Sequence, residues 1–232
     1  LNPTMTIGKQ IAESLTEHLG LSVSDARRRT VVLLRNVGIP DAERRFNAYP
    51  HHFSGGMRQR VMIAIAVACS PKIVIADEPT TALDVTVQAQ IVDLIKRLQA
   101  QMGMAVIWIT HDLGVVAGIA DRVIVMYGGT VVENAPVDDL YENPRHPYTI
   151  GLLKAIPRLE ATGQAEMEEL EAIEGTPPDL YQELTLCPFA PRCTYAFDRC
   201  WAEVPPLIKV GQQHETACFY DVDRGGPRHG FG

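Results

Sequence analysis

Residues 73–80 read IVIADEPT. A short β-branched apolar run of this kind, placed after a proline, is typical of a buried β-strand. The strand ends in two adjacent carboxylates, at a point that in an open α/β sheet faces the ligand crevice. There Asp77 would hold a Mg²⁺ ion through water, and Glu78 would orient or deprotonate the water that attacks a γ-phosphate. The same two residues are also common where a strand simply ends in a polar turn.

A second apolar strand, AVIWIT at residues 105–110, directly precedes His111. Between the two strands, residues 85–102 place apolar side chains on one helical face, and Gly103 ends that helix. This strand–helix–strand order indicates a parallel sheet covered by helices. His111 should therefore lie at the same sheet edge as Glu78, where an imidazole can contact a γ-phosphate and hold the attacking water. A lone histidine after a strand is more often a loop residue or a helix cap.

Upstream of these strands, FSGGMRQR at residues 53–60 precedes the apolar run VMIAIAVAC. The length of that run, counted from Ser54, favours a buried helix. The serine and the amides of Gly55 and Gly56 can donate to phosphate oxygens, and the helix N-terminus adds positive potential. A serine cap followed by a glycine-rich turn explains the pattern equally well when it is taken alone.

Taken together, the order of these motifs resembles the nucleotide-binding subunits of ATP-binding cassette (ABC) transporters over residues 1–155. FSGGMRQR is similar to the signature loop, IVIADE to the Walker B strand, TTALD to the D-loop, and the histidine after the second strand to the switch histidine. The resemblance implies ATP and Mg²⁺ as cofactors. It assigns Glu78 and His111 to catalysis. It assigns nucleotide contacts to Ser54, Gly55, Gly56, Gln59, Asp77 and Asp84.

Further stretches resemble one branch of that family, the oligopeptide/dipeptide importers. They are LNPTMTIG, YPHHFSGGMRQR, DEPTTALDVTVQAQI, NPRHPYTIGLL, GTPPDL and CPFAPRC. His52 departs from the pattern, which has an acidic or amide residue there. The resemblance implies a subunit that couples ATP hydrolysis to peptide uptake. A nickel importer of the same branch, a soluble ABC ATPase and a non-enzymatic binding module are the alternatives.

The same resemblance implies a set of partners. A second ABC ATPase subunit would pack head to tail with this one, so that FSGGMRQR contacts ATP held by the partner. Two membrane permease subunits and an extracytoplasmic substrate-binding protein would complete the transporter. The protein would then lie at the cytoplasmic face of a bacterial or archaeal plasma membrane.

The phosphate-binding P-loop, G-x-x-x-x-G-K-[ST], has no counterpart in the sequence. The only Gly-Lys pair, Gly8-Lys9, has Pro3 where the first glycine is required and Gln10 where Ser or Thr is required. We therefore expect the first strands, the P-loop and the Q-loop glutamine of the family to lie upstream of Leu1. On this view the full-length protein hydrolyses ATP and the fragment alone does not.

Composition limits the classes of function. The chain has 232 residues, 46% of them hydrophobic, and a formal net charge of −7. That charge argues against nucleic-acid binding through a general basic field. No apolar run approaches the roughly 18–20 residues that span a bilayer, so a membrane role would come through a partner.

Four of the five cysteines lie in the last fifth of the chain. Their spacings are longer than the paired C-x₂-C of a zinc ribbon, whereas four thiolates suit a [4Fe–4S] cluster. The family resemblance points the same way, because this branch often carries such a tail; zinc and free thiols are the alternatives. The expected ligands are Cys187, Cys193, Cys200 and Cys218.

The expected fold is α/β: a P-loop NTPase (ABC ATPase) core lacking its N-terminal strands and P-loop, with a helical subdomain and a small Cys-rich C-terminal module. Helical patterns at 6–19 and 22–38, with no strand between them, predict the helical subdomain. The expected divisions are a permease-contacting helical subdomain at 1–52, the C-terminal part of the core at 53–156, a linker at 157–180, the Cys-rich module at 181–221 and a disordered tail at 222–232.

Overall fold

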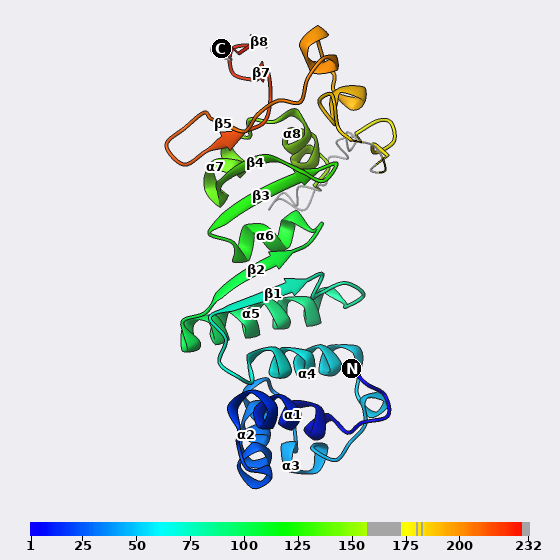
Figure 1. Ribbon diagram of the computed structural model, residues 1–232, viewed down its shortest axis with the longest axis vertical. Coiled ribbons are helices and arrows are strands. Elements are labelled where there is room, and N and C mark those ends of the chain that lie inside the picture. Colours follow the sequence, from blue (N-terminus) through cyan, green and yellow to red (C-terminus); the bar gives the residue numbers. More distant parts are fainter. Residues whose placement is uncertain (157–172, 180, 182, 229–232) are drawn as a thin grey trace, which may run out of the picture. The chain divides into compact units, whose positions relative to one another are not determined.

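The computed structural model describes residues 1–156, 173–179, 181 and 183–228 (Figure 1). The chain divides into two compact units, Leu1–His111 and Asp112–Gly232, and each is described by itself. In the described residues no helix is long and apolar enough to cross a membrane.

The first unit begins with helices, and the first two lie within the patterns predicted at 6–19 and 22–38. The elements are α1 (Ile7–Leu19), α2 (Val23–Asn36), the short α3 (Ala42–Arg45), a 3₁₀ turn at Pro50–His52, and α4 (Gly55–Val67). Gly20 ends α1 in the left-handed conformation, with φ at 64°. Ser22 caps α2 by accepting a hydrogen bond from the Asp25 amide at 3.1 Å.

Helix α4 packs against α1 and α2 as well as against α5 (Val85–Met102). Ile11, Leu34, Val61 and Ile91, one from each of these helices, are fully buried. The predicted boundary at residue 52 therefore differs from the structure, in which the helices before and after it share one core.

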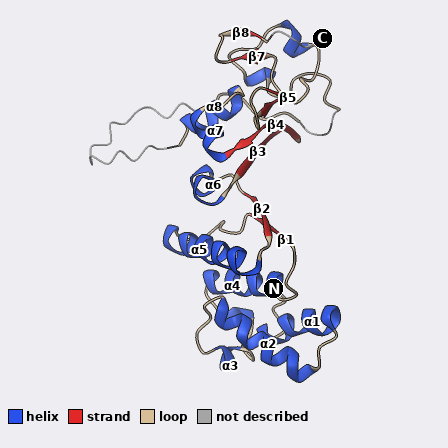
Figure 2. Ribbon diagram, turned by 90° about the vertical axis from the view of Figure 1, so that its left-hand side faces the viewer, coloured by secondary structure: helices blue, strands red, loops and turns tan. Residues whose placement is uncertain are grey.

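Strands β1 (Ile73–Asp77) and β2 (Ala105–Ile109) are parallel, as predicted, with Asp77 opposite Ile109. Figure 2 shows the pair as red arrows, next to helix α5. The prediction of fully buried strands was wrong. Val74 and Ala76 are buried, but Ile73 and Ile75 are 58% and 66% exposed, because they point to the opposite face of the strand pair.

The second unit contains α6 (Leu113–Ile119) and the antiparallel hairpin β3 (Arg122–Tyr127) and β4 (Thr130–Pro136). Gly128 and Gly129 form the turn of the hairpin, with φ of 56° and 78°, a conformation that glycine adopts without strain. Helices α7 (Val137–Glu142) and α8 (Pro147–Lys154) follow.

Short elements complete this unit. They are 3₁₀ turns at Ala190–Arg192 and Asp198–Trp201, and strands β5 (Ile208–Lys209), β6 (Glu215–Thr216), β7 (Tyr220–Asp221) and β8 (Gly226–Pro227). One sheet has the order β3-β4-β6-β5, so the tail of the chain is hydrogen-bonded to β4.

The predicted separate module at 181–221 differs from this arrangement. Cys187, Phe189 and Phe219 share a hydrophobic core with Val125 and Leu140 of the preceding elements. The predicted disordered tail also differs: strand β8 pairs with β7, which orders residues 222–228. Most of the predicted linker at 157–180, and residues 229–232, lie outside the described residues.

Candidate functional site

The carboxylate–histidine pair predicted at the edge of the parallel strands is present. Because β1 and β2 run parallel and in register, both end at one edge, where the Glu78 amide donates to the Ile109 carbonyl at 2.9 Å. The Nδ1 atom of His111 lies 2.8 Å from Oε1 of Glu78. A carboxylate oxygen only accepts, so Nδ1 carries the proton in this contact.

Thr81 is a third member of this group, and its role was not predicted. Its hydroxyl donates to Oε2 of Glu78 at 2.7 Å. Hydrogen bonds from Thr81 and then from His111 lower the pKa of Glu78. The carboxyl group is therefore ionised at neutral pH and is oriented through both of its oxygens. The only sequence signal was a hydroxyl residue three positions after the glutamate.

The backbone at this edge is strained. Glu78 has φ of 46° and Ala82 has φ of 63°, in the left-handed region that residues with a Cβ adopt at a cost of about 1–3 kcal/mol. Such strain is concentrated at functional sites, where the surrounding structure holds it in place. Asp77, one residue before Glu78, is exposed at the end of β1.

The FSGGMRQR stretch forms the start of α4, as predicted. Ser54 is the exposed N-cap, and its hydroxyl accepts from the Met57 amide at 3.4 Å. Gly55 is exposed, whereas a Cβ on Gly56 would lie 2.5 Å from Val87 Cγ1 on α5. Gly56 is therefore also required for close packing of two helices, a reason that differs from the predicted approach to a phosphate.

Asp84, the predicted D-loop residue, lies next to this helix start. It caps α5 by accepting from the Val87 amide at 3.0 Å. A Cβ on Gly55 would contact Leu83 at 3.6 Å, and Val87, at the other side of Asp84 in the sequence, faces Gly56. The structure thus brings the signature start and Asp84 together, at the N-termini of two neighbouring helices. Gln59, within α4, is half-buried.

The two arginines of the same stretch make structural contacts. Arg58 donates to the Pro50 carbonyl at 2.9 Å, and Arg60 donates to the Val37 carbonyl at 2.8 Å and to Gln90 Oε1 at 3.0 Å. They attach the start of α4 to the helices before it and to α5.

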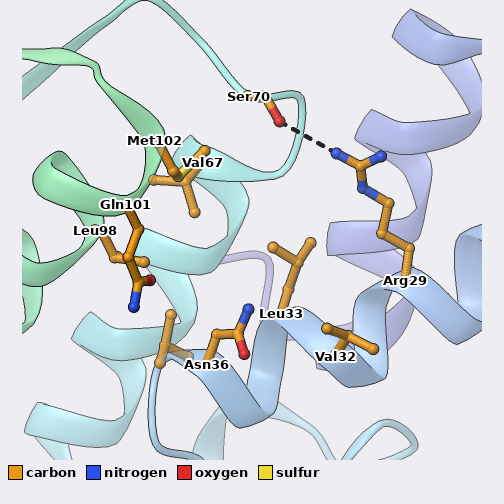
Figure 3. Close-up of a pocket in the computed structure, with 10 residues that line it drawn as sticks. Arg29, Val32, Leu33, Asn36, Val67, Ser70, Leu98, Gln101 and Met102 are labelled. Atoms are coloured by element: carbon orange, nitrogen blue, oxygen red, sulfur yellow. Dashed lines mark hydrogen bonds between the residues drawn. The ribbon is translucent and has the colours of Figure 1, made fainter.

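A pocket of about 230 Å³ lies at the other ends of α4 and α5, beside α2 (Figure 3). Arg29 closes one side of it by donating to the Ser70 hydroxyl at 3.2 Å. Its lining includes Val67 and Met102 and none of the predicted nucleotide-contact residues.

Cys187 and Cys200 lie in the hydrophobic core of the second unit, and Cys193 packs against it. Cys218 is also buried, and it precedes Phe219, which belongs to that core. Among the described residues no three His, Cys, Asp or Glu side chains are grouped so that they could hold a metal ion. The predicted group of four cysteine ligands is therefore not borne out as a site for a single metal ion. Burial, with a smaller contribution from the neighbouring thiols, raises the pKa of Cys193 to about 11 and that of Cys218 to about 12.

The same thiols receive hydrogen bonds from the backbone. The amides of Phe189, Tyr195 and Tyr220 each donate to the cysteine two positions earlier, which favours the thiolate form. For Cys218 the donor–acceptor distance is 3.4 Å.

Comparison with known proteins gives the family. A model described as "ABC transporter" matches residues 1–81, and one described as "Oligopeptide/dipeptide transporter, C-terminal region" matches residues 132–200. The chain therefore belongs to the ATP-binding proteins of ABC transporters.

Named relatives narrow this class. The oligopeptide transport ATP-binding protein AppD of Bacillus subtilis is 51% identical over 97% of this chain and 67% of its own length. OppD of Bacillus subtilis is 55% identical over 92% of this chain and 59% of its own length. OppD of Salmonella typhimurium is 50% identical over 96% of this chain and 65% of its own length. The chain thus belongs to the oligopeptide transport ATP-binding family, and it spans about two thirds or less of these relatives.

Proposed function

We propose that this chain is the larger part of an ATP-binding subunit that couples ATP hydrolysis to the import of oligopeptides or dipeptides. The observation that carries the proposal is the Glu78–His111–Thr81 group at the end of two parallel strands. The names of the relatives favour peptides over nickel as the cargo.

In the proposed mechanism Glu78 orients and deprotonates the water that attacks the γ-phosphate. Its lowered pKa keeps it an acceptor at neutral pH, and its two hydrogen bonds fix the direction of the carboxylate. His111 contacts the γ-phosphate region. Asp77, exposed beside this group, would hold Mg²⁺ through water, and the ion would neutralise the charge that develops on the phosphate oxygens.

Ser54, Gly55, Gly56 and Gln59 would contact ATP held by a second ABC ATPase subunit in a head-to-tail dimer, with Asp84 beside them. The support is physical: an exposed serine and an exposed glycine amide stand at the N-terminus of a 13-residue helix, where backbone N–H groups and the helix dipole favour a phosphate.

The proposed partners follow from the same function. Two membrane permease subunits would contact the helices within residues 1–52, and an extracytoplasmic binding protein would deliver the peptide. The subunit would lie at the cytoplasmic face of a bacterial or archaeal plasma membrane. The net charge of −7 gives no support to a nucleic-acid partner.

We also propose that Cys187, Cys193, Cys200 and Cys218 hold a [4Fe–4S] cluster. Each thiolate of such a cluster binds a different iron, so the ligands need not converge on one ion. Soft donors, the buried positions of Cys187, Cys200 and Cys218, and N–H donors to three of the thiols suit iron–sulfur ligation. Iron and sulfide analysis of anaerobically purified protein tests this proposal, and stoichiometric zinc without iron would exclude it.

The ATPase proposal is tested with Glu78→Gln in the whole subunit, assembled with its transporter. Loss of a positioned base should lower ATP turnover and peptide uptake by about 100-fold or more, while ATP binding persists. The exposed Glu142→Gln, outside the helices proposed to contact the permease, serves as the matched control. Turnover by Glu78→Gln equal to that of this control would reject the assigned role.

A further inference from the structure

A polar pocket of about 290 Å³ lies on the four-stranded sheet of the second unit. Each strand contributes one side chain to its lining: Arg122 from β3, Asn134 from β4, Glu215 from β6 and Lys209 from β5. Asn134 is paired with Glu215, and Glu215 with Lys209, so these three side chains stand next to one another on one face of the sheet. The pairing of the strands therefore gathers charged and amide groups at one place.

The arginine of this pocket is held in place with a donor to spare. Nη1 of Arg122 donates to Asn134 Oδ1 at 2.9 Å and to the Gln213 carbonyl at 3.1 Å, and Nη2 donates to Gln213 Oε1 at 3.0 Å. Among the described residues its Nε–H has no acceptor. His214, also in the lining, is buried, with Nε2 at 2.7 Å from Oε1 of Glu133. These side chains are fixed before any ligand binds, which lowers the entropy cost of binding.

The charges of the pocket are not used by one another. Nδ2 of Asn134 donates to Glu215 Oε2 at 2.8 Å, so the amide lies between the arginine and the carboxylate. In the described part of the chain Glu215 forms no ion pair with Arg122 or Lys209, and the Lys209 ammonium group has no partner there. The pocket thus presents two positive charges and one negative charge to a ligand.

We propose that this pocket binds a short peptide with free termini. Glu215 would repel a ligand that carries only a carboxylate, and the two cations would repel one that carries only an ammonium group, whereas a zwitterion matches both. Arg122 and Lys209 would bind the peptide carboxylate, and Glu215 the ammonium group. The amide side chains of Gln212 and Gln213, both in the lining, can donate to and accept from a peptide bond.

The size of the pocket and the proposed function narrow the ligand further. Its volume is near the lower limit of small-molecule sites, about 300–1,000 Å³, which favours a peptide of very few residues. The choice of peptides among zwitterions rests on the proposed function, because an importer delivers peptides to the side of the membrane on which this subunit would lie.

The experiment is an NMR titration of the ¹⁵N-labelled full chain with the dipeptide Ala-Ala. We expect shifts confined to residues around the pocket. N-acetyl-Ala-Ala lacks the ammonium group and Ala-Ala amide lacks the carboxylate, so each should bind ~10-fold more weakly or worse, since each loses a charge-assisted hydrogen bond. Alanine carries both charges without a peptide bond and should also bind more weakly than Ala-Ala.

Two variants assign the charges. Lys209→Met should weaken Ala-Ala binding ~10-fold, whereas Lys96→Met, which removes an exposed lysine from α5, should bind like wild type. Glu215→Gln keeps an acceptor for Asn134 and should weaken binding of Ala-Ala but not of N-acetyl-Ala-Ala.

Each contrary result overturns a stated part of the proposal. No shifts around the pocket at ~10 mM Ala-Ala, or equal affinity of Lys209→Met and Lys96→Met, would overturn the site. Equal affinity for alanine and Ala-Ala would overturn the assignment to peptides. The proposed function is tested separately by Glu78→Gln in the assembled transporter: failure there with Ala-Ala bound here leaves the site standing, and the reverse result removes only the site.

Discussion

Replacing Glu133 with glutamine should loosen the attachment of the C-terminal tail. The Glu133 side chain is fully buried on β4. Its Oε1 accepts from the Arg145 amide and, at 2.7 Å, from Nε2 of His214, and its Oε2 accepts from the His146 amide at 3.0 Å. One carboxylate therefore connects β4, the start of α8 and the tail before β6.

The size of the effect follows from those three donors. Glutamine can keep its oxygen at the Oε1 position, but its NH₂ group then faces the His146 N–H, which loses its acceptor. A buried unpaired donor costs about 1–3 kcal/mol, and the two remaining bonds lose their charge-assisted part, about 1 kcal/mol each. Removing a buried charge offsets some of this cost, so we expect a net destabilisation of about 2–4 kcal/mol.

The assay is urea unfolding of the full chain followed by Trp201 fluorescence in a Trp108→Phe background, because the sequence has only these two tryptophans. The exposed Glu142→Gln is the control, with an expected change within about 0.5 kcal/mol. A double-mutant cycle with His214→Gln should give a coupling of about 1 kcal/mol or more. Equal stabilities of Glu133→Gln and Glu142→Gln would refute the reasoning.

Three further predictions concern the other features described above. Gly56→Ala should destabilise the first unit by about 1–3 kcal/mol in urea unfolding, because its Cβ would lie 2.5 Å from Val87 Cγ1. Adding Val87→Ala should restore the stability. A double variant as unstable as Gly56→Ala would contradict the packing role. Burial, with a contribution from the Arg228 charge, lowers the pKa of His146 to about 3, so from about pH 6.5 down to 3 the unfolded chain binds a proton that the folded chain does not. Stability should fall by about 1.4 kcal/mol per pH unit in that window, and His146→Gln should flatten the slope measured by unfolding at several pH values; an equal slope in the variant would count against it. In the assembled transporter, Ser54→Arg should impair ATP turnover at the partner's site while nucleotide binding to its own subunit persists, and weakened binding there would contradict the head-to-tail assignment.

Local patterns in the sequence were sufficient for most elements of the first unit. Ser22, Gly20 and Gly103 end or begin helices for reasons contained within one turn of chain, so they could be read without the fold. The meeting of Glu78 and His111 was also predictable, because strand direction alone decides which ends share an edge.

What the sequence did not predict depends on contacts between distant residues. Strand β6 is two residues long and pairs with β4 about eighty positions earlier, so no local period marks it. For the same reason the four tail cysteines were assigned to a separate module, although three of them, Cys187, Cys193 and Cys200, pack in or against the core of β3 and β4. The packing role of Gly56 and the hydrogen bond from Thr81 to Glu78 likewise require the positions of neighbours that periodicity does not give.

The pairing of β4 with β6, about eighty positions later, has a consequence for the order of folding. Glu133 meets His214 across 81 positions, and Phe219 packs in the same core as β3 and β4. During synthesis the apolar face of that hairpin is made long before the residues that cover it leave the ribosome. The second unit should therefore complete its folding only after residues 214–228 have left the ribosome, and chains that stop before this stretch should be the forms that aggregate or recruit chaperones.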